Sequence, residues 1–82
     1  MQEIIDFVKS LYHPSKKGGF TIVVITDTQI MYHCYSKNKA YMIQLGVIQA
    51  KTYCKEGRQG VKVFVFDHST GVLDEIDFIK IY

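Results

Sequence analysis

The residue types best suited to metal binding or nucleophilic chemistry are two cysteines and three histidines, scattered along the 82-residue chain. They are His13, His33, Cys34, Cys54 and His68. None of the spacings typical of zinc sites, such as Cys-x-x-Cys or His-Glu-x-x-His, occurs among them. His33 and Cys34 are adjacent in a predicted strand, so their side chains should point to opposite faces of the sheet. We therefore predict no metal site, no cofactor and two buried free thiols.

A cysteine nucleophile would need a histidine close to it in space. Pairing of Cys34 or Cys54 with His13 or His68 stays open, because such partners need not be near in sequence. Free cysteine in a strand is nevertheless more often a small core residue. A small enzyme or nucleotide-binding protein with a pocket between subunits, using His33 or His68, is therefore the least favoured function.

Two short polar segments resemble catalytic or phosphate-binding sequences only in composition. The residues of Asp67-His68-Ser69-Thr70 would diverge in a tight turn, and turns favour Asp, Ser and Thr for backbone reasons. Lys16-Lys17-Gly18-Gly19 lacks the spacing of a phosphate-binding loop and precedes a strand instead of a helix. We predict no catalytic residue in either segment.

Basic residues interleaved with tyrosines are the main surface feature of the sequence. The candidate partner surface comprises Tyr35, Lys37, Lys39, Tyr41, Lys51, Tyr53, Lys55, Arg58 and Lys62. Single-stranded nucleic-acid sites combine stacking rings with a positive groove, whereas tyrosines are equally typical of protein interfaces. The pI of about 8.5 lies below the value of about 9 that marks many nucleic-acid-binding domains. Region 37–62 thus supports either a protein partner or, as the alternative, nucleic acid.

Charge is divided along the chain. Residues 37–62 contain six basic residues and one acid, a net charge of +5, whereas residues 67–82 contain four acids and one lysine, a net charge of −3. Such a division can steer an anionic partner to one region or let copies of the chain attract each other.

The N-terminal segment has the pattern of one amphipathic helix over residues 2–12. Its apolar positions recur at helical spacing and are Ile4, Ile5, Val8, Leu11 and Tyr12. Glu3 and Lys9 have the signs that a helix dipole favours at its two ends. His13-Pro14 should end the helix, because a residue that precedes proline avoids the helical region.

Four further segments are predicted to be strands from their β-branched and aromatic residues. They are Phe20–Ile25, Gln29–Tyr35, Val61–Asp67 and Leu73–Tyr82. The first is continuously apolar, so we place it at the centre of the sheet, buried on both faces. Asn38 is expected to be the left-handed residue of the turn at Ser36–Lys39, and Gly71 that of a hairpin loop at Asp67–Gly71.

Residues 40–54 are ambiguous. As a strand, the segment places Tyr41, Ile43 and Leu45 on one face. As a helix, it would spread its apolar residues around the whole circumference, with Gly46 in the interior at a cost of about 1 kcal/mol. We favour a long strand bent by a bulge at Gly46.

These elements predict one α+β domain over residues 1–82, with an N-terminal amphipathic helix packed on a largely antiparallel sheet of about five strands. The order of a helix and then strands resembles that of small barrels such as the Sm-like fold, so closure into a small barrel is an alternative, although that family's paired motifs are absent. The N-terminus does not have the pattern of a secretory signal. The longest apolar run is far short of the roughly 20 residues that span a membrane. We expect a cytoplasmic protein, of a cell or a virus-infected host cell, with no membrane partner.

The leading functional expectation is a small non-catalytic protein-binding module: an inhibitor, an adaptor or an assembly subunit. Small domains often gain support from oligomerisation, so we also expect a homo-oligomer. Chains of this size without linkers or motifs are common among the accessory proteins of phages and mobile elements.

Overall fold

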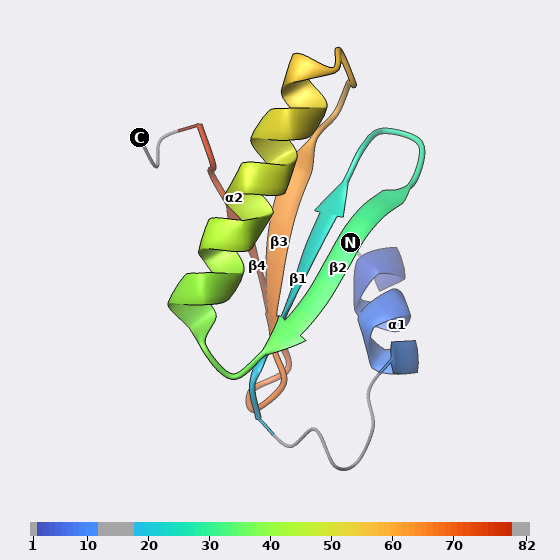
Figure 1. Ribbon diagram of the computed structural model, residues 1–82. Helices are drawn as coiled ribbons and strands as arrows, with labels where there is room; N and C mark the ends of the chain where they lie inside the picture. The colour runs from blue at the N-terminus through green and yellow to red at the C-terminus, as the bar shows by residue number, and fades with distance from the viewer. Residues whose placement is uncertain (1, 12–17, 80–82) are drawn as a thin grey trace.

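Four antiparallel strands lie between two helices in the computed structural model, which describes residues 2–11 and 18–79 (Figure 1). The elements in chain order are α1 (Gln2–Leu11), β1 (Phe20–Ile25), β2 (Ile30–Ser36), α2 (Lys39–Lys55), β3 (Lys62–Asp67) and β4 (Val72–Ile76). The order of strands across the sheet is β2-β1-β3-β4. The predicted N-terminal helix is confirmed; Tyr12 and the His13-Pro14 stop lie outside the described residues.

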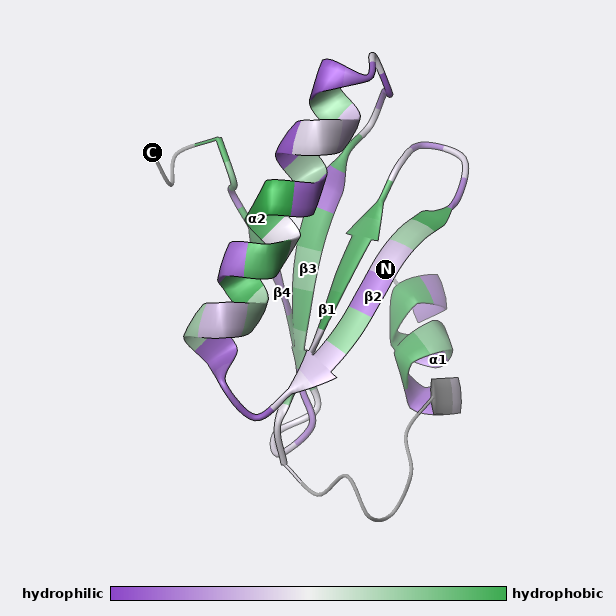
Figure 2. Ribbon diagram, viewed as in Figure 1, coloured by the Kyte–Doolittle hydropathy of each residue, from purple (hydrophilic) through white to green (hydrophobic). Residues whose placement is uncertain are grey.

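The two central strands bury side chains on both faces of the sheet, as their continuous apolar sequences predict. Ile22 of β1 and Val63 of β3 pack towards α2, whereas Val23 and Phe64 pack towards Ile4 and Val8 of α1. In Figure 2, most of β1 is green, while α2 alternates between polar and apolar residues. The prediction that Phe20–Ile25 is a central strand is confirmed.

Residues 40–54 form most of the helix α2, so the prediction of a long strand bent at Gly46 is wrong. The residues of α2 that are buried against the sheet are Met42, Gly46, Val47 and Ala50. They recur at helical spacing, but two of them are small, while Tyr41 and Ile48 are about half exposed on the other side. When the buried residues of a helix include small ones and some of its exposed residues are apolar, large apolar residues do not recur clearly at helical spacing. This explains why the sequence pattern was misinterpreted.

Asn38 begins α2 and does not form a left-handed turn. Its backbone is extended, with φ of −99° and ψ of 103°. Its side-chain Oδ1 accepts a hydrogen bond of 3.0 Å from the backbone N–H of Tyr41. Asparagine is among the preferred residues at a helix N-cap for this reason. Asparagine is also common in tight turns, and this second preference led to the wrong prediction of a left-handed turn residue.

The sheet is not closed into a barrel. β1 is antiparallel to both β2 and β3, so these two strands run in the same direction with β1 between them. α2 connects them by crossing one face of the sheet (Figure 1). Because this segment is a helix, the sheet has four strands and not about five, and β2 and β4 lie at its two edges.

The last predicted strand, Leu73–Tyr82, is shorter in the structure. β4 ends at Ile76, and Phe78 is then buried against α2; residues 80–82 lie outside the described residues. The hairpin loop between β3 and β4 ends at Gly71 with φ of 75°, and the N–H of Gly71 donates to the carbonyl oxygen of Asp67 at 2.8 Å. The left-handed glycine predicted there is confirmed.

Candidate protein-interaction site

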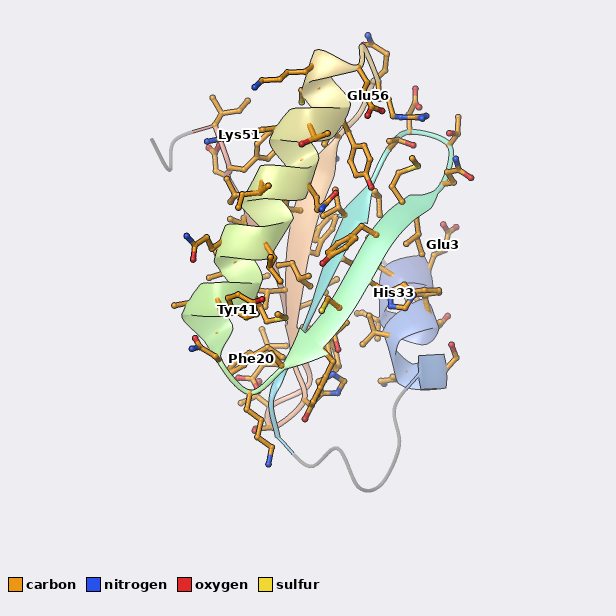
Figure 3. The ribbon with its side chains drawn as sticks, viewed as in Figure 1. Glu3, Phe20, His33, Tyr41, Lys51 and Glu56 are labelled. Atoms are coloured by element: carbon orange, nitrogen blue, oxygen red, sulfur yellow. The ribbon has the colours of Figure 1, made fainter. Side chains whose placement is uncertain are left out.

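The basic and aromatic residues singled out in the sequence fall into two groups near opposite ends of α2. Tyr35, Lys37, Lys39 and Tyr41 lie where β2 leads into the helix, and Lys51, Tyr53, Lys55, Arg58 and Lys62 lie where the helix leads into β3. Figure 3 shows Tyr41 and Lys51 well apart along α2. At a rise of 1.5 Å per residue, the backbones of Lys39 and Lys51 are about 18 Å apart. The structure therefore does not bring these residues into one cluster.

The tyrosines of this set are not displayed together as stacking rings. The hydroxyl of Tyr35 donates to the carbonyl oxygen of Gly18 at 2.9 Å. The hydroxyl of Tyr53 donates to the carbonyl oxygen of Met31 at 3.5 Å. Both rings are half-buried, whereas Tyr41 is 51% exposed. Tyr35 and Tyr53 thus help to hold the fold together at β2.

Several of the basic side chains have contacts within the chain. The ammonium group of Lys39 lies 5.7 Å from the ring centroid of Phe20, a cation–π distance. Nε of Arg58 lies 3.2 Å from Oε1 of Glu56. Desolvation lowers the pKa of Lys51, and the like charge of Lys55 one turn further on lowers it again. Of these contacts, the ion pair with Glu56 offsets the charge of Arg58, whereas Lys39 keeps its charge in the cation–π contact.

The sheet separates the residues that were considered for metal binding or catalysis. Cys34 packs on the face covered by α2, while the ring of His33 contacts that of Phe7 on the other face at 5.3 Å between centroids. The predicted divergence of these neighbours is confirmed. Cys34 is half-buried and Cys54 exposed, so the prediction of two buried thiols is wrong. Within residues 2–11 and 18–79, no three His, Cys, Asp or Glu side chains lie close enough to hold a metal ion.

His68 lies on the α1 face, between β1 and the β3–β4 loop. Its Nε2 is 2.6 Å from Oγ1 of Thr21, and its ring packs edge-on against Phe66 with centroids 5.0 Å apart. A shallow cavity of about 210 Å³ is lined by His68 and by Lys9, Phe66 and Gly71. The hydroxyl of Thr21 does not line this cavity, and the residue is 5% exposed. The His68–Thr21 contact therefore ties the loop to β1 and does not present a nucleophile.

The edge strand β2 is the feature that sequence reasoning missed. Its seven residues, Ile30–Ser36, include no lysine, arginine, acid or proline. Natural proteins usually protect exposed sheet edges with charge, proline or short strands, because an edge leaves one row of backbone groups available to another chain. β4, at the other edge, has five residues and carries Asp74 and Glu75. The lack of charge in β2 is visible in the sequence, but its edge position is not.

Among the described strands, β2 pairs only with β1. All of its side chains are partly buried except that of His33, which is exposed. His33 points from β2 towards α1 in Figure 3. A row of backbone hydrogen-bonding groups flanked by partly buried side chains is the geometry of strand addition, in which main-chain bonds give affinity and alternate side chains give specificity.

In the described parts of the chain, both helices fall short of the length and apolarity that crossing a membrane requires. Comparisons of this chain with protein-family models, with curated proteins and with solved structures found no match.

Proposed function

We propose that this protein is a small non-catalytic protein-binding module, whose partner adds a strand to the outer edge of β2. The observation that carries the proposal is the contrast between the two edges of the sheet. β2 is a seven-residue strand without charge, whereas β4 is shorter and acidic. An inhibitor, an adaptor and an assembly subunit would all use such an edge in the same way.

Strand addition supplies part of the free energy that a functional interaction needs. Each backbone hydrogen bond contributes about 0.5–1.5 kcal/mol net, and each cross-strand side-chain pair contributes about 0.2–1 kcal/mol. A partner strand along most of β2 would form several of both. Affinity in the micromolar range needs about 8 kcal/mol, so contacts beyond the strand, such as with α1 or α2, would decide how tightly a partner binds.

The proposal is tested by placing a charge at each edge in turn. His33→Lys puts a lysine at the middle of β2, which is how natural edges resist pairing. Val72→Lys is the matched control, because Val72 is 49% exposed on β4. Both variants are first checked for wild-type secondary structure by circular dichroism. We expect the wild-type chain and Val72→Lys to capture the same protein from an extract of the native host, and His33→Lys to capture much less of it.

Hydrogen exchange on the purified complex then locates the contact. We expect the backbone amides of β2 to exchange more slowly in the complex than in the isolated chain. Equal capture by all three chains, or slowed exchange elsewhere with β2 unchanged, would show that β2 is not the binding edge.

A further inference from the structure

We propose that the strand added to β2 is β2 of a second copy of this chain, paired antiparallel about a two-fold axis. The resulting dimer has one continuous sheet, in which the four strands of each copy join at the β2 edges. This inference rests on the proposed function, because it names the occupant of the same edge.

The side chains of β2 are compatible with pairing between two copies of this strand. In a two-fold antiparallel pair, residues near the start of one strand lie opposite residues near the end of the other, and the middle residues meet at the axis. Like charges placed directly opposite each other destabilise such a pair. β2 has no lysine, arginine or acid between Ile30 and Ser36, so self-pairing opposes no like charges from these side chains.

The charges that flank the two ends of β2 have opposite signs. Asp27 lies in the turn just before the strand, and Lys37 and Lys39 follow it; all three residues are exposed. Antiparallel pairing places the start of one β2 beside the end of the other. Asp27 of each copy therefore lies near Lys37 and Lys39 of the second copy, and the symmetry repeats this attraction at both ends of the interface.

The other edge of the sheet, β4, disfavours assemblies longer than a dimer. Pairing of β2 with β4 of the next copy would continue without closing and produce an open fibre. Such pairing would place Asp74 and Glu75 of β4 beside an uncharged strand, and it would lose the paired attraction between Asp27 and the lysines at the two flanks of β2. Pairing of β4 with itself would bring carboxylates together. The closed dimer through β2 is the arrangement that avoids both costs.

Charge reversal at the flanks tests the arrangement. The chain has a mass of 9.5 kDa, and we expect light scattering at micromolar concentration and low salt to give twice this value. Asp27→Lys alone, or Lys37→Asp together with Lys39→Asp, replaces attraction by repulsion at both ends. Each should raise the dissociation constant of the dimer by about tenfold or more, because the attraction at both ends of the interface becomes repulsion.

Mixing the two charge-reversed proteins provides the decisive measurement. A mixed dimer contains opposite charges at both flanks again, so we expect a heterodimer with close to wild-type affinity. Asp74→Lys on β4 is the matched control and should leave the dimer intact. His33→Lys should weaken the wild-type dimer, because it places two lysines close to the axis.

A monomeric mass at 100 µM would overturn this inference and leave the binding of a different protein at β2 to be decided by capture and hydrogen exchange. A dimer whose affinity is unchanged by the flank substitutions and by His33→Lys would overturn it as well, because its interface would lie elsewhere. If the β2 amides are slow to exchange in the dimer and the mixture restores affinity, both proposals are supported.

Discussion

Gly46 of α2 lies directly against Ile22 of β1: a Cβ atom added to the glycine would be 2.6 Å from Cγ1 of Ile22 and 2.9 Å from Cγ1 of Val63. Real Cβ atoms do not approach other carbons so closely. Both neighbouring side chains are β-branched and fully buried, so neither can move aside easily. The glycine therefore sets how closely α2 packs on the two central strands.

Gly46→Ala should lower the free energy of unfolding, by up to about 2 kcal/mol. Overpacking costs about 1–3 kcal/mol, and the better helix propensity of alanine returns about 1 kcal/mol. Urea denaturation followed by circular dichroism measures the change. Gln44→Ala, at an exposed position of the same helix, is the control and should change stability by less than about 0.5 kcal/mol. A stabilised Gly46→Ala variant would mean that α2 packs less closely on Ile22 and Val63 than these distances imply.

Asn38→Ala should destabilise the protein by about 1 kcal/mol, because it removes the acceptor for the N–H of Tyr41 at the start of α2. Asn38→Asp keeps the acceptor and adds negative charge at a helix N-terminus that has no acid in its first turn. The aspartate variant should therefore be as stable as wild type or slightly more stable. Thermal denaturation of the three proteins compares them, and equal stability of all three would argue against capping by Asn38.

The stability of the protein at alkaline pH should depend on the ionisation of Tyr32 on β2. Burial raises the pKa of its phenol above the ordinary value of 10.0, and Cys34 beside it raises it further. Because the folded state holds this proton more tightly than the unfolded state, its contribution to stability is present below pH 10 and is lost as the pH rises towards the folded pKa. Tyr32→Phe should make stability fall less steeply above pH 10.

Ultraviolet titration of the wild-type chain and Tyr32→Phe checks the assignment. The difference between the two curves should show one phenol that ionises above pH 10. A difference that titrates at or below pH 10 would contradict burial of Tyr32 against α2.

Single-stranded oligonucleotides should bind weakly. The basic residues of region 37–62 form two groups about 18 Å apart along α2, and among its tyrosines Tyr41 is the exposed one. Fluorescence anisotropy at low salt is expected to give little binding, with no marked change for a variant in which Lys51, Lys55 and Arg58 are replaced by glutamate. Tight binding that falls steeply with salt and is abolished in that variant would favour a nucleic-acid function.

Local sequence patterns were sufficient to predict α1 and the two central strands. The apolar residues of α1 recur at helical spacing, and Phe20–Ile25 is β-branched without charge, so each pattern fits one conformation. Residues 40–54 fit two conformations. What makes them helical is the contact of Gly46 and Ala50 with the sheet, together with the cap at Asn38, and only the cap is local.

At the candidate site, too, some features follow from the sequence and others depend on the tertiary structure. The sequence by itself determined that His33 and Cys34 diverge, that Ile30–Ser36 carries no charge, and that Asp27 and Lys37 flank it. Only the tertiary structure decided that this strand lies at an edge, because α2 passes from β2 over β1 to β3 and leaves β2 with one neighbour among the described strands. Side-chain composition is local, whereas the pairing of strands depends on contacts between residues far apart in the chain. The edge of β2, the basis for both proposals, is therefore a property of the fold.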